Sequence, residues 1–370
     1  MRFNLSGVCT DELLRLLKIL LPPCNIPGSK YLLNQTVKSA VNFDSFCKIH
    51  LSCANCKSYI SEMENYETEI LCSVCKEKML SSDLLEGGHF FIYVPLEHQL
   101  KQKFEKQNVF EDIEKLRENC VDNTTYKDIT DGKKYTMPDV RNSVSLQFNV
   151  DGIPVYNKSK FDLWPIHCMI NELPLAKRKE NIIMCGLWFG PNKPNFKSYL
   201  VPFITELTLL CERGLIWNRN GKTVVTKIVP LLCTADAPAR AMLQNFKQFN
   251  GKYGCSFCEN EGERVVRGRG HSRIYKLLQP VPEKRTFQKT VKYAEKALNS
   301  DKTIKGVKGS SLLMQLYPHF DMIEGFVPDY MHSVLLGVTR QFVNLWLSPS
   351  DETYCLKKKK KMKSMKESVT

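Results

Sequence analysis

The chain has 370 residues, of which 43% are hydrophobic and 25% are charged, the proportions of a globular protein with room for two or three domains. No run of eighteen apolar residues occurs, and the N-terminal segment lacks a signal cleavage site, so we expect an intracellular protein without a membrane span. The net charge of +14 favours a polyanion as partner, and nucleic acid is the commonest one, although a lysine-rich C-terminal run supplies seven of these charges.

The N-terminal segment, residues 1–44, is expected to be helical. Residues 10–21 carry apolar side chains at helical spacing, Thr10 can cap the N-terminus, and Pro22 ends the pattern.

Two Cys-x-x-Cys pairs follow, Cys53 with Cys56 and Cys72 with Cys75. Each pair can sit on a tight turn that offers two thiolates to one tetrahedral metal ion, and this spacing is typical of a zinc ribbon. We therefore predict a small ribbon at residues 45–80 that holds a structural Zn²⁺. Its role beyond folding, in contact with DNA or with a protein, stays open.

Residues 81–142 are expected to form a linker with helical parts. Residues 96–116 are charged and helical in tendency, whereas residues 122–138 are polar and rich in turn formers. This polar stretch marks a domain boundary at about residues 135–142.

Strands and helices alternate from residue 143 onward. Residues 144–150 alternate apolar and polar side chains and lead into Asp151, and residues 181–189 form a second apolar strand. Residues 199–211 have helical spacing and end before Gly214. Residues 223–233 are again strand-like and lead to Asp236, which can cap a helix that begins at Ala237.

Asp151 and Asp236 thus each follow an apolar strand. Carboxylates in such positions can bind Mg²⁺ or Mn²⁺, ions that activate and stabilise oxygen atoms in phosphoryl transfer. The alternative is ordinary structure, since an aspartate before glycine is common in turns and an aspartate before Ala-Pro is a common helix cap.

An ordered set of motifs in residues 145–347 resembles the CACTA (En/Spm-like) transposase family, in its invertebrate form. The set comprises Asp151-Gly152-Ile153-Pro154-Val155-Tyr156, Trp164-Pro165-Ile166, Gly190-Pro191-Asn192-Lys193-Pro194, Tyr199-Leu200-Val201-Pro202-Phe203 with Glu206 and Gly214, Asp236-Ala237-Pro238-Ala239-Arg240, Gly254-Cys255-Ser256-Phe257-Cys258, and Pro328-Asp329-Tyr330-Met331-His332 with Leu336-Gly337-Val338.

This resemblance implies an α/β fold for residues 143–347, namely the ribonuclease-H-like core of a DDE transposase, a mixed sheet with flanking helices. In such a core a first aspartate lies on the first strand and a second follows the fourth strand, positions that Asp151 and Asp236 match. The family also carries a zinc knuckle inserted after the second aspartate, which Cys255 and Cys258 match. Two cysteines cannot complete a tetrahedral zinc site, and His332 is a weak candidate for a further ligand.

The third acidic residue of the family is expected beyond the Asp-x-Met-His segment, so the chain resembles a C-terminally truncated transposase. Asp329 is a weak substitute. Residues 348–370 form a lysine-rich stretch expected to be a disordered tail.

The basic residues Arg240, Arg264, Arg267 and Arg269 are weak candidates for DNA contacts. The last three belong to a glycine-containing segment that reads equally well as an exposed loop.

The resemblance implies metal-dependent cleavage and strand transfer at transposon ends in the nucleus, with DNA as partner and inactivity where the third acid is missing. The alternative is a non-catalytic, zinc-dependent remnant that binds DNA or protein. The oligomeric state stays open, a homo-oligomer being one option.

Overall fold

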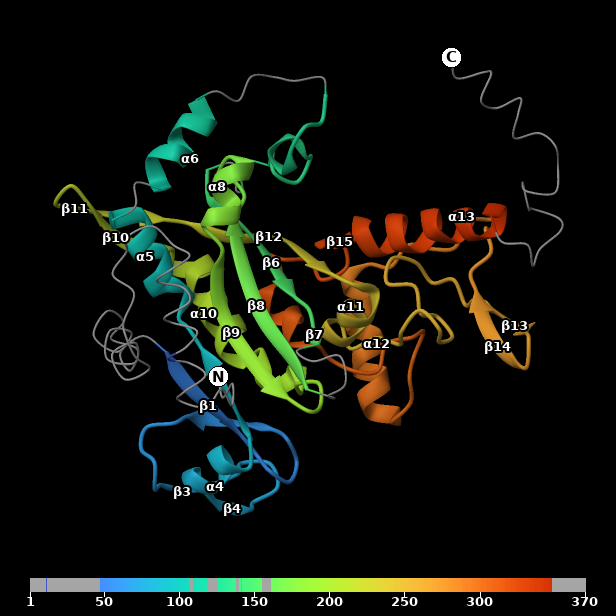
Figure 1. Cartoon of the computed structure of the whole chain (residues 1–370), viewed down its shortest axis with the longest axis horizontal. Helices are drawn as coiled ribbons and strands as arrows, with labels where there is room; N and C mark the ends of the chain where they lie inside the picture. The colour runs from blue at the N-terminus through green and yellow to red at the C-terminus, as the bar shows by residue number, and fades with distance from the viewer. Residues whose placement is uncertain are drawn as a thin grey trace. The chain divides into compact units, whose positions relative to one another are not determined.

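The computed structural model describes residue 11 and residues 47–106, 109–118, 125–137, 140, 142–154 and 161–347. The chain falls into two compact units, Met1–Ile49 and His50–Thr370. Asp11 is helical, but the rest of the helix predicted at residues 10–21 and the tail predicted at residues 348–370 lie outside the described residues. The second unit is a mixed α/β fold (Figure 1).

Strands and helices follow one another along most of the second unit. The strands are β1 (Lys48–Ser52), β2 (Tyr59–Glu62), β3 (Glu69–Leu71), β4 (Lys78–Leu80), β5 (Phe90–Tyr93), β6 (Val144–Val150), β7 (Ile153–Pro154), β8 (Asp162–Ile170), β9 (Ile183–Gly190), β10 (Leu215–Arg219), β11 (Lys222–Thr226), β12 (Ile228–Ala235), β13 (Glu263–Arg267), β14 (Gly270–Ile274) and β15 (Phe326–Pro328). The helices are α4 (Ser81–Glu86), α5 (Leu96–Lys106), α6 (Val109–Glu118), η1 (Ile129–Asp131), α8 (Leu175–Glu180), α9 (Phe196–Tyr199), α10 (Val201–Arg213), α11 (Ala237–Leu243), α12 (Phe287–Ser300), η2 (Leu312–Leu316), η3 (Met331–Thr339) and α13 (Arg340–Leu347).

A mixed sheet of nine described strands organises the unit, in the order β15-β12-β6-β8-β9-β5-β1-β2 with β7 beside β8. The neighbours β15, β12 and β6 are parallel, whereas β8 is antiparallel to β6 and to β9, and β9 is antiparallel to β5. The carboxyl ends of three adjacent strands therefore meet at one edge of the sheet.

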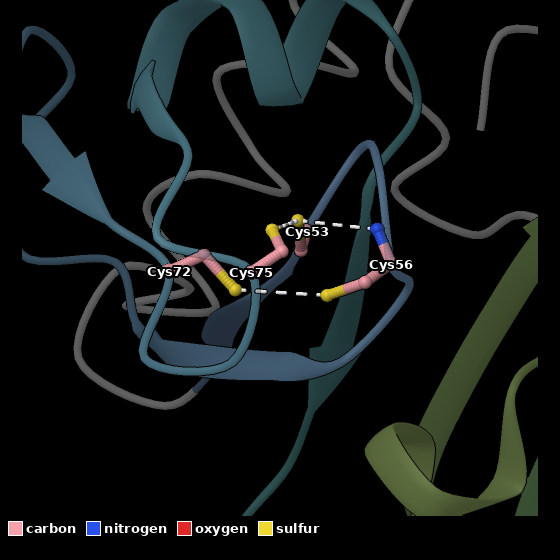
Figure 2. A group of neighbouring side chains, drawn as sticks. All are labelled: Cys53, Cys56, Cys72 and Cys75. Atoms are coloured by element: carbon pink, nitrogen blue, oxygen red, sulfur yellow. Dashed lines mark hydrogen bonds between the residues drawn. The ribbon is translucent and has the colours of Figure 1, made fainter.

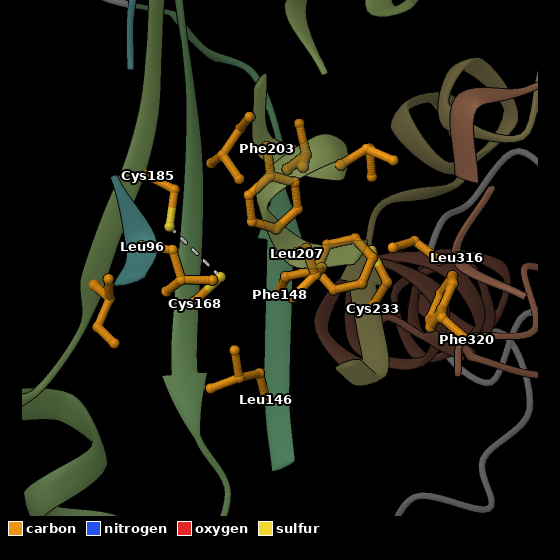
Figure 3. Close-up of a cluster of buried hydrophobic side chains, with 14 of the residues drawn as sticks. Leu96, Leu146, Phe148, Cys168, Cys185, Phe203, Leu207, Cys233, Leu316 and Phe320 are labelled. Carbon is orange, nitrogen blue, oxygen red and sulfur yellow. Dashed lines mark hydrogen bonds between the residues drawn. The ribbon is translucent and has the colours of Figure 1, made fainter. Parts of the chain in front are cut away.

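The central strand β6 shows why these residues form a sheet. The side chains at alternate positions, Val144, Leu146, Phe148 and Val150, are all buried, as the alternation in the sequence predicted. In Figure 3 Phe148 lies in the buried cluster, with ring centroids 5.7 Å from Phe203 of α10 and 5.1 Å from Phe320. The same cluster includes side chains of α5, so helices and strands share one core.

One predicted helix ends, and another begins, where the sequence indicated, although the first starts at Val201 and not at Tyr199. Helix α10 ends at Gly214, whose φ of 76° lies in the left-handed region that favours glycine. Helix α11 begins after Asp236, whose Oδ1 accepts a hydrogen bond from the N–H of Ala239 at 2.6 Å, and Pro238 lies in its first turn. The predicted cap at Asp236 is confirmed.

Two segments differ from the sequence prediction. Residues 223–233 were expected as one strand, but the chain forms β11, which pairs with β10 in a hairpin, and then β12, which joins the main sheet. The basic segment after Cys258 was expected to be an exposed loop or a DNA contact without regular structure, but it forms the antiparallel hairpin β13–β14.

The region expected as a linker, residues 81–142, contributes to the main sheet as well. Strand β5 pairs with β9, and β1 and β2 of the ribbon region extend the sheet beyond β5. The strands β1 and β2 of the ribbon region thus share one sheet with the core strands. Among the described residues, no helix combines the length and the apolar character needed to cross a membrane.

Candidate functional site

The four ribbon cysteines lie on two turns of the same design. Cys53 donates its N–H to Ser58 and accepts from the N–H of Lys57, and Cys72 repeats this with Glu77 and Lys76 at closely similar distances of 2.9–3.1 Å. Lys57 and Lys76 have φ values of 59° and 62°, so the left-handed residue that closes each turn is a lysine in both. The turns therefore present two cysteines each to a common centre.

That centre can hold a metal ion (Figure 2). The sulfur atoms of Cys53, Cys56, Cys72 and Cys75 all lie within 4.8 Å of one another. The Sγ atoms of Cys53 and Cys75 are 3.5 Å apart, and those of Cys56 and Cys72 are 3.6 Å apart. Four thiolates around one Zn²⁺ lie about 3.8 Å from one another. The predicted cysteine cluster is confirmed as one that could hold a structural metal such as zinc.

Ser58 lowers the pKa of two of these thiols, whereas burial and the neighbouring sulfurs raise the pKa of Cys75 to about 12. Its hydroxyl lies 3.0 Å from Cys56 Sγ and 3.3 Å from Cys72 Sγ. Hydrogen bonding to Ser58 is the main cause that lowers the pKa of Cys72 to about 6 and also lowers the pKa of Cys56. Thiolates are the metal-binding form of cysteine, so Ser58 favours the form that zinc needs.

Three aspartates lie in one row at the carboxyl edge of the parallel strands. The register pairs Thr234 of β12 with Asn149 of β6, and Ala235 with Pro328 of β15. Continuing two residues from the first pair brings Asp236 opposite Asp151, and continuing one residue from the second brings Asp236 opposite Asp329. Neighbouring strands are about 4.8 Å apart, so Asp236 lies between two flanking carboxylates.

The oxygens of this row are only partly used. Asp151 Oδ1 accepts a hydrogen bond from the N–H of Gly152 at 2.8 Å, and Asp236 Oδ1 accepts from Ala239. Among the described residues, the second oxygen of Asp151 and that of Asp236 accept no hydrogen bond. Partial burial, followed by the negative charge of Asp236, raises the pKa of Asp151. Unpaired carboxylates that repel one another are typical of a site for a cation.

Asp329 is fixed by His332. Its Oδ2 lies 2.5 Å from Nδ1 of His332, and its Oδ1 accepts a hydrogen bond from the N–H of the same residue at 3.2 Å. Partial burial opposes ionisation of Asp329, but the hydrogen bonds from His332 outweigh it and lower its pKa. In return the hydrogen bond to Asp329 raises the pKa of His332, and Asp236 and Asp151 contribute further. The charges of His332 and Asp329 therefore interact with those of Asp151 and Asp236.

Gly152 allows close packing beside the row. A Cβ atom at this position would lie 2.5 Å from Cζ2 of Trp164, a distance that no side chain tolerates. Trp164 itself is buried. The glycine after Asp151 thus lets an indole ring pack against the turn that carries the carboxylate.

The second cysteine pair does not gather a full ligand set. In the parts of the chain that the structure describes, the ribbon is the one group of three or more His, Cys, Asp or Glu residues with ligand atoms within 4.8 Å of one another. His332, expected as a weak partner for Cys255 and Cys258, is instead bound to Asp329. Burial raises the pKa of Cys258, which indicates a thiol in a protected turn.

Arg240 connects the aspartate row to this second turn. Its Nε lies 3.3 Å from Oγ of Ser256, and its guanidinium lies 4.9 Å from the ring centroid of Phe257. Burial lowers the pKa of Arg240, while the nearby charges of Cys255, Asp236 and Asp329 act in the opposite direction. The residue links two parts of the site, which leaves its expected contact with DNA untested. Arg264, Arg267 and Arg269 lie on the exposed hairpin β13–β14 and its turn.

The sequence indicated Asp151 and Asp236 by their positions after apolar strands and by the family resemblance, and Asp329 only as a weak substitute. The signal that could have given Asp329 more weight as a site residue is the short run Phe326-Val327-Pro328 before it. This run repeats the pattern of an aspartate after an apolar strand. No protein-family model matches the chain, and comparison with curated proteins gives no match either. Side-chain geometry is therefore the main guide to function.

Proposed function

We propose that this chain is a transposase-type protein that cleaves and joins DNA strands at a divalent-metal site built by Asp151, Asp236 and Asp329. The observation that carries the proposal is the register of β6, β12 and β15, which brings the three aspartates into one row. The second oxygens of Asp151 and Asp236, which accept no hydrogen bond among the described residues, suit a hard divalent cation beside the carboxylate of Asp329.

Mg²⁺ and Mn²⁺ fit the donor set, because each takes oxygen ligands and commonly uses only one or two carboxylates beside water and phosphate. When bound, such ions lower the pKa of an attacking water and stabilise the leaving oxygen of a phosphodiester. Asp151 and Asp236 would hold the cation with their free oxygens. Asp329, kept ionised and oriented by His332, would serve as the third ligand.

The strand order supports a ribonuclease-H-like core. In that fold the first aspartate belongs to the first strand and the second follows the fourth. Among the longer strands of the main sheet from β6 onward, namely β6, β8, β9 and β12, Asp151 follows the first and Asp236 follows the fourth. The motif set that resembles CACTA transposases points the same way, and it makes DNA the substrate and the nucleus the place of action.

A non-catalytic DNA-binding remnant is the second candidate. The observation that favours it is the spacing of the row, because the carboxylate oxygens of the three aspartates do not all come within 4.8 Å of one another. On this reading the protein would bind DNA through the ribbon and a basic surface elsewhere in the chain, without cutting it. The two candidates differ in their dependence on metal and on the aspartates.

A cleavage assay distinguishes them. Labelled duplex DNA that carries the terminal inverted repeats of the host element is incubated with zinc-loaded protein and Mg²⁺ or Mn²⁺. We expect strand cleavage that falls by about a thousandfold or more in Asp151→Asn and in Asp236→Asn, since each removes a charged ligand at unchanged volume.

Asp301→Asn is the matched control, because Asp301 is exposed and its φ of 50° is one that asparagine also adopts. It should cleave as the wild type does. Folded, zinc-loaded wild-type protein that binds this DNA but leaves it intact would overturn the catalytic proposal in favour of the remnant.

A further inference from the structure

We infer that the hairpin β13–β14 is a DNA-binding ribbon, fastened so that it presents duplex DNA to the aspartate row. This inference rests on the proposed function for its choice of polyanion. The hairpin spans Glu263–Arg267 and Gly270–Ile274, and its turn consists of Gly268 and Arg269.

The charges on the hairpin favour a phosphate partner. Arg264, Arg267 and Arg269 are all exposed, and within the described part of the chain none of them forms an ion pair. The acidic residue of the hairpin, Glu263, lies at its base and pairs with Lys276 at 2.5 Å. The end of the hairpin therefore carries positive charge that no protein carboxylate neutralises.

Cross-strand pairing on one face of the hairpin breaks a rule of sheet stability. Arg264 stands directly opposite Arg273, whose guanidinium donates to the carbonyls of Gly262 and Glu261, and like charges in such a pair destabilise an isolated hairpin. On the same face Val266 is 76% exposed and stands opposite His271. A basic face with an exposed aliphatic side chain is understandable if DNA covers it, because an antiparallel ribbon fits the major groove and an aliphatic group can contact a thymine methyl.

The base of the hairpin is anchored to the Cys255–Cys258 turn. Tyr275 at the end of β14 accepts a hydrogen bond from the N–H of Gly254 at 2.9 Å and donates its hydroxyl to the carbonyl of Gly251 at 2.5 Å. Asn260 donates to the carbonyl of Lys276 at 3.1 Å. These bonds hold the residues that follow β14 against the segments on either side of the cysteine turn, so the hairpin is supported at its base.

The same turn is anchored to the helix that follows Asp236. Arg240 of α11 contacts Ser256 and Phe257 of the turn, as described above. On the other side Arg285 donates to the carbonyls of Cys255 and Tyr253, each at 2.9 Å. A continuous set of contacts thus connects Asp236, α11, the cysteine turn and the hairpin, which fixes the hairpin relative to the row.

Fluorescence anisotropy with a labelled duplex tests the inference without cleavage. Binding is measured in buffer free of Mg²⁺ and Mn²⁺ at NaCl concentrations from about 50 to 300 mM. The variant Arg264→Gln, Arg267→Gln, Arg269→Gln should bind about tenfold more weakly or worse, and its log K should depend less steeply on log salt by about 2 to 3.

The matched control removes three lysines elsewhere: Lys179→Gln, Lys222→Gln, Lys227→Gln. All three are exposed, Lys222 begins the second strand of the hairpin β10–β11, and Lys227 precedes β12 at the end opposite Asp236. The hairpins β10–β11 and β13–β14 lie on opposite sides of the main sheet in Figure 1. The control should keep the wild-type slope, as should the rescue variant Arg264→Lys, Arg267→Lys, Arg269→Lys, because the slope depends on the number of charges that meet phosphates.

Equal losses in the hairpin variant and the control would show that only net charge matters and would overturn the inference. So would a hairpin variant that binds as the wild type does, or a lysine rescue that fails, since phosphate contacts require charge and not the shape of arginine. The outcome is separate from that of cleavage. Binding that depends on the hairpin β13–β14, without any cleavage, would support the hairpin as a DNA-binding element and reject the proposed catalysis. Cleavage together with binding that does not depend on the hairpin would support the catalysis and reject the role of the hairpin.

Discussion

Some single residues in the sheet core lower the stability of the fold in a way that the sequence alone does not reveal, and Glu172 is the clearest case. Its side chain is buried in the turn after β8, where Oε1 accepts a hydrogen bond from the N–H of Ser145 at 2.9 Å and Oε2 lies buried without a partner. Burial raises the pKa of Glu172 to about 7, and the hydrogen bonds from Ser145 offset this only partly. The carboxyl group therefore ionises inside the protein only as the pH rises through about 7.

This arrangement predicts that the stability of the folded state depends on pH. Because the folded pKa lies above the unfolded value of 4.5, the folded state binds more protons, and stability falls as pH rises from 4.5 to about 7. Replacing Glu172 with Gln keeps the acceptor and removes the charge. The difference in unfolding free energy between Glu172→Gln and wild type should grow by up to about 3 kcal/mol as the pH rises from 4.5 to about 7. Above about pH 7 it should stay constant.

Urea unfolding at pH values from about 5 to 9 measures this difference. The matched control is Glu180→Gln, an exposed neighbour on α8, which should give a curve parallel to that of the wild type. A constant gap between Glu172→Gln and wild type at every pH would mean that Glu172 ionises normally in the folded protein.

At the scale of elements, the two cysteine turns of the ribbon differ from the turn at Cys255 and Cys258 in one respect that metal analysis can detect. The ribbon gathers four sulfurs, whereas the later pair gathers no third ligand among the described residues. Besides the strands that it shares with the main sheet, the ribbon is hydrogen-bonded to the core. The carbonyl of Lys57 accepts hydrogen bonds from Asn195 at 3.0 Å and Ser198 at 2.6 Å. The zinc content of the protein should therefore depend on the four ribbon cysteines and not on Cys255 and Cys258.

We expect Cys72→Ser to lose one equivalent of zinc, and Cys258→Ser, which serves as the control, to keep the wild-type content. Loss of the metal should expose the ribbon to proteolysis between Cys53 and Leu80, because small four-cysteine units fold only with zinc. The β6–β12 core should persist, since its apolar cluster lies outside the ribbon. Zinc release with a chromogenic chelator and limited proteolysis read out both effects. A Cys258→Ser protein that loses zinc would contradict this assignment and restore a second zinc site.

At the scale of the whole molecule, local patterns in the sequence were good guides and long-range pairings were not. The alternation in β6 and the cap at Asp236 depend on neighbours a few residues away, and both predictions are confirmed. The break between β11 and β12 at Lys227 was missed, because apolar and β-branched residues continue across it and only the pairing of β11 with β10 separates the two strands. The hairpin β13–β14 was missed because glycine and arginine outnumber strand formers there, although Val265 and Val266 offered a signal.

The candidate site shows the same division. Each aspartate follows a short apolar run that can be found in the sequence, but the row exists only through the register of three parallel strands. Residues 151, 236 and 329 are too far apart in the chain for any local pattern to reveal that they are neighbours. Asp329 was accordingly given little weight in the sequence, whereas the sheet gives it a place beside Asp236.

Binding of Mn²⁺ to zinc-loaded protein, followed by the electron paramagnetic resonance signal of the free ion, tests this row most directly. We expect Asp329→Asn to weaken Mn²⁺ binding by about tenfold or more, as Asp151→Asn and Asp236→Asn should, while Asp301→Asn binds as wild type. Unchanged Mn²⁺ affinity in all three row variants would contradict a divalent-metal site at this edge of the sheet. Unchanged affinity in Asp329→Asn alone would remove the third ligand from it.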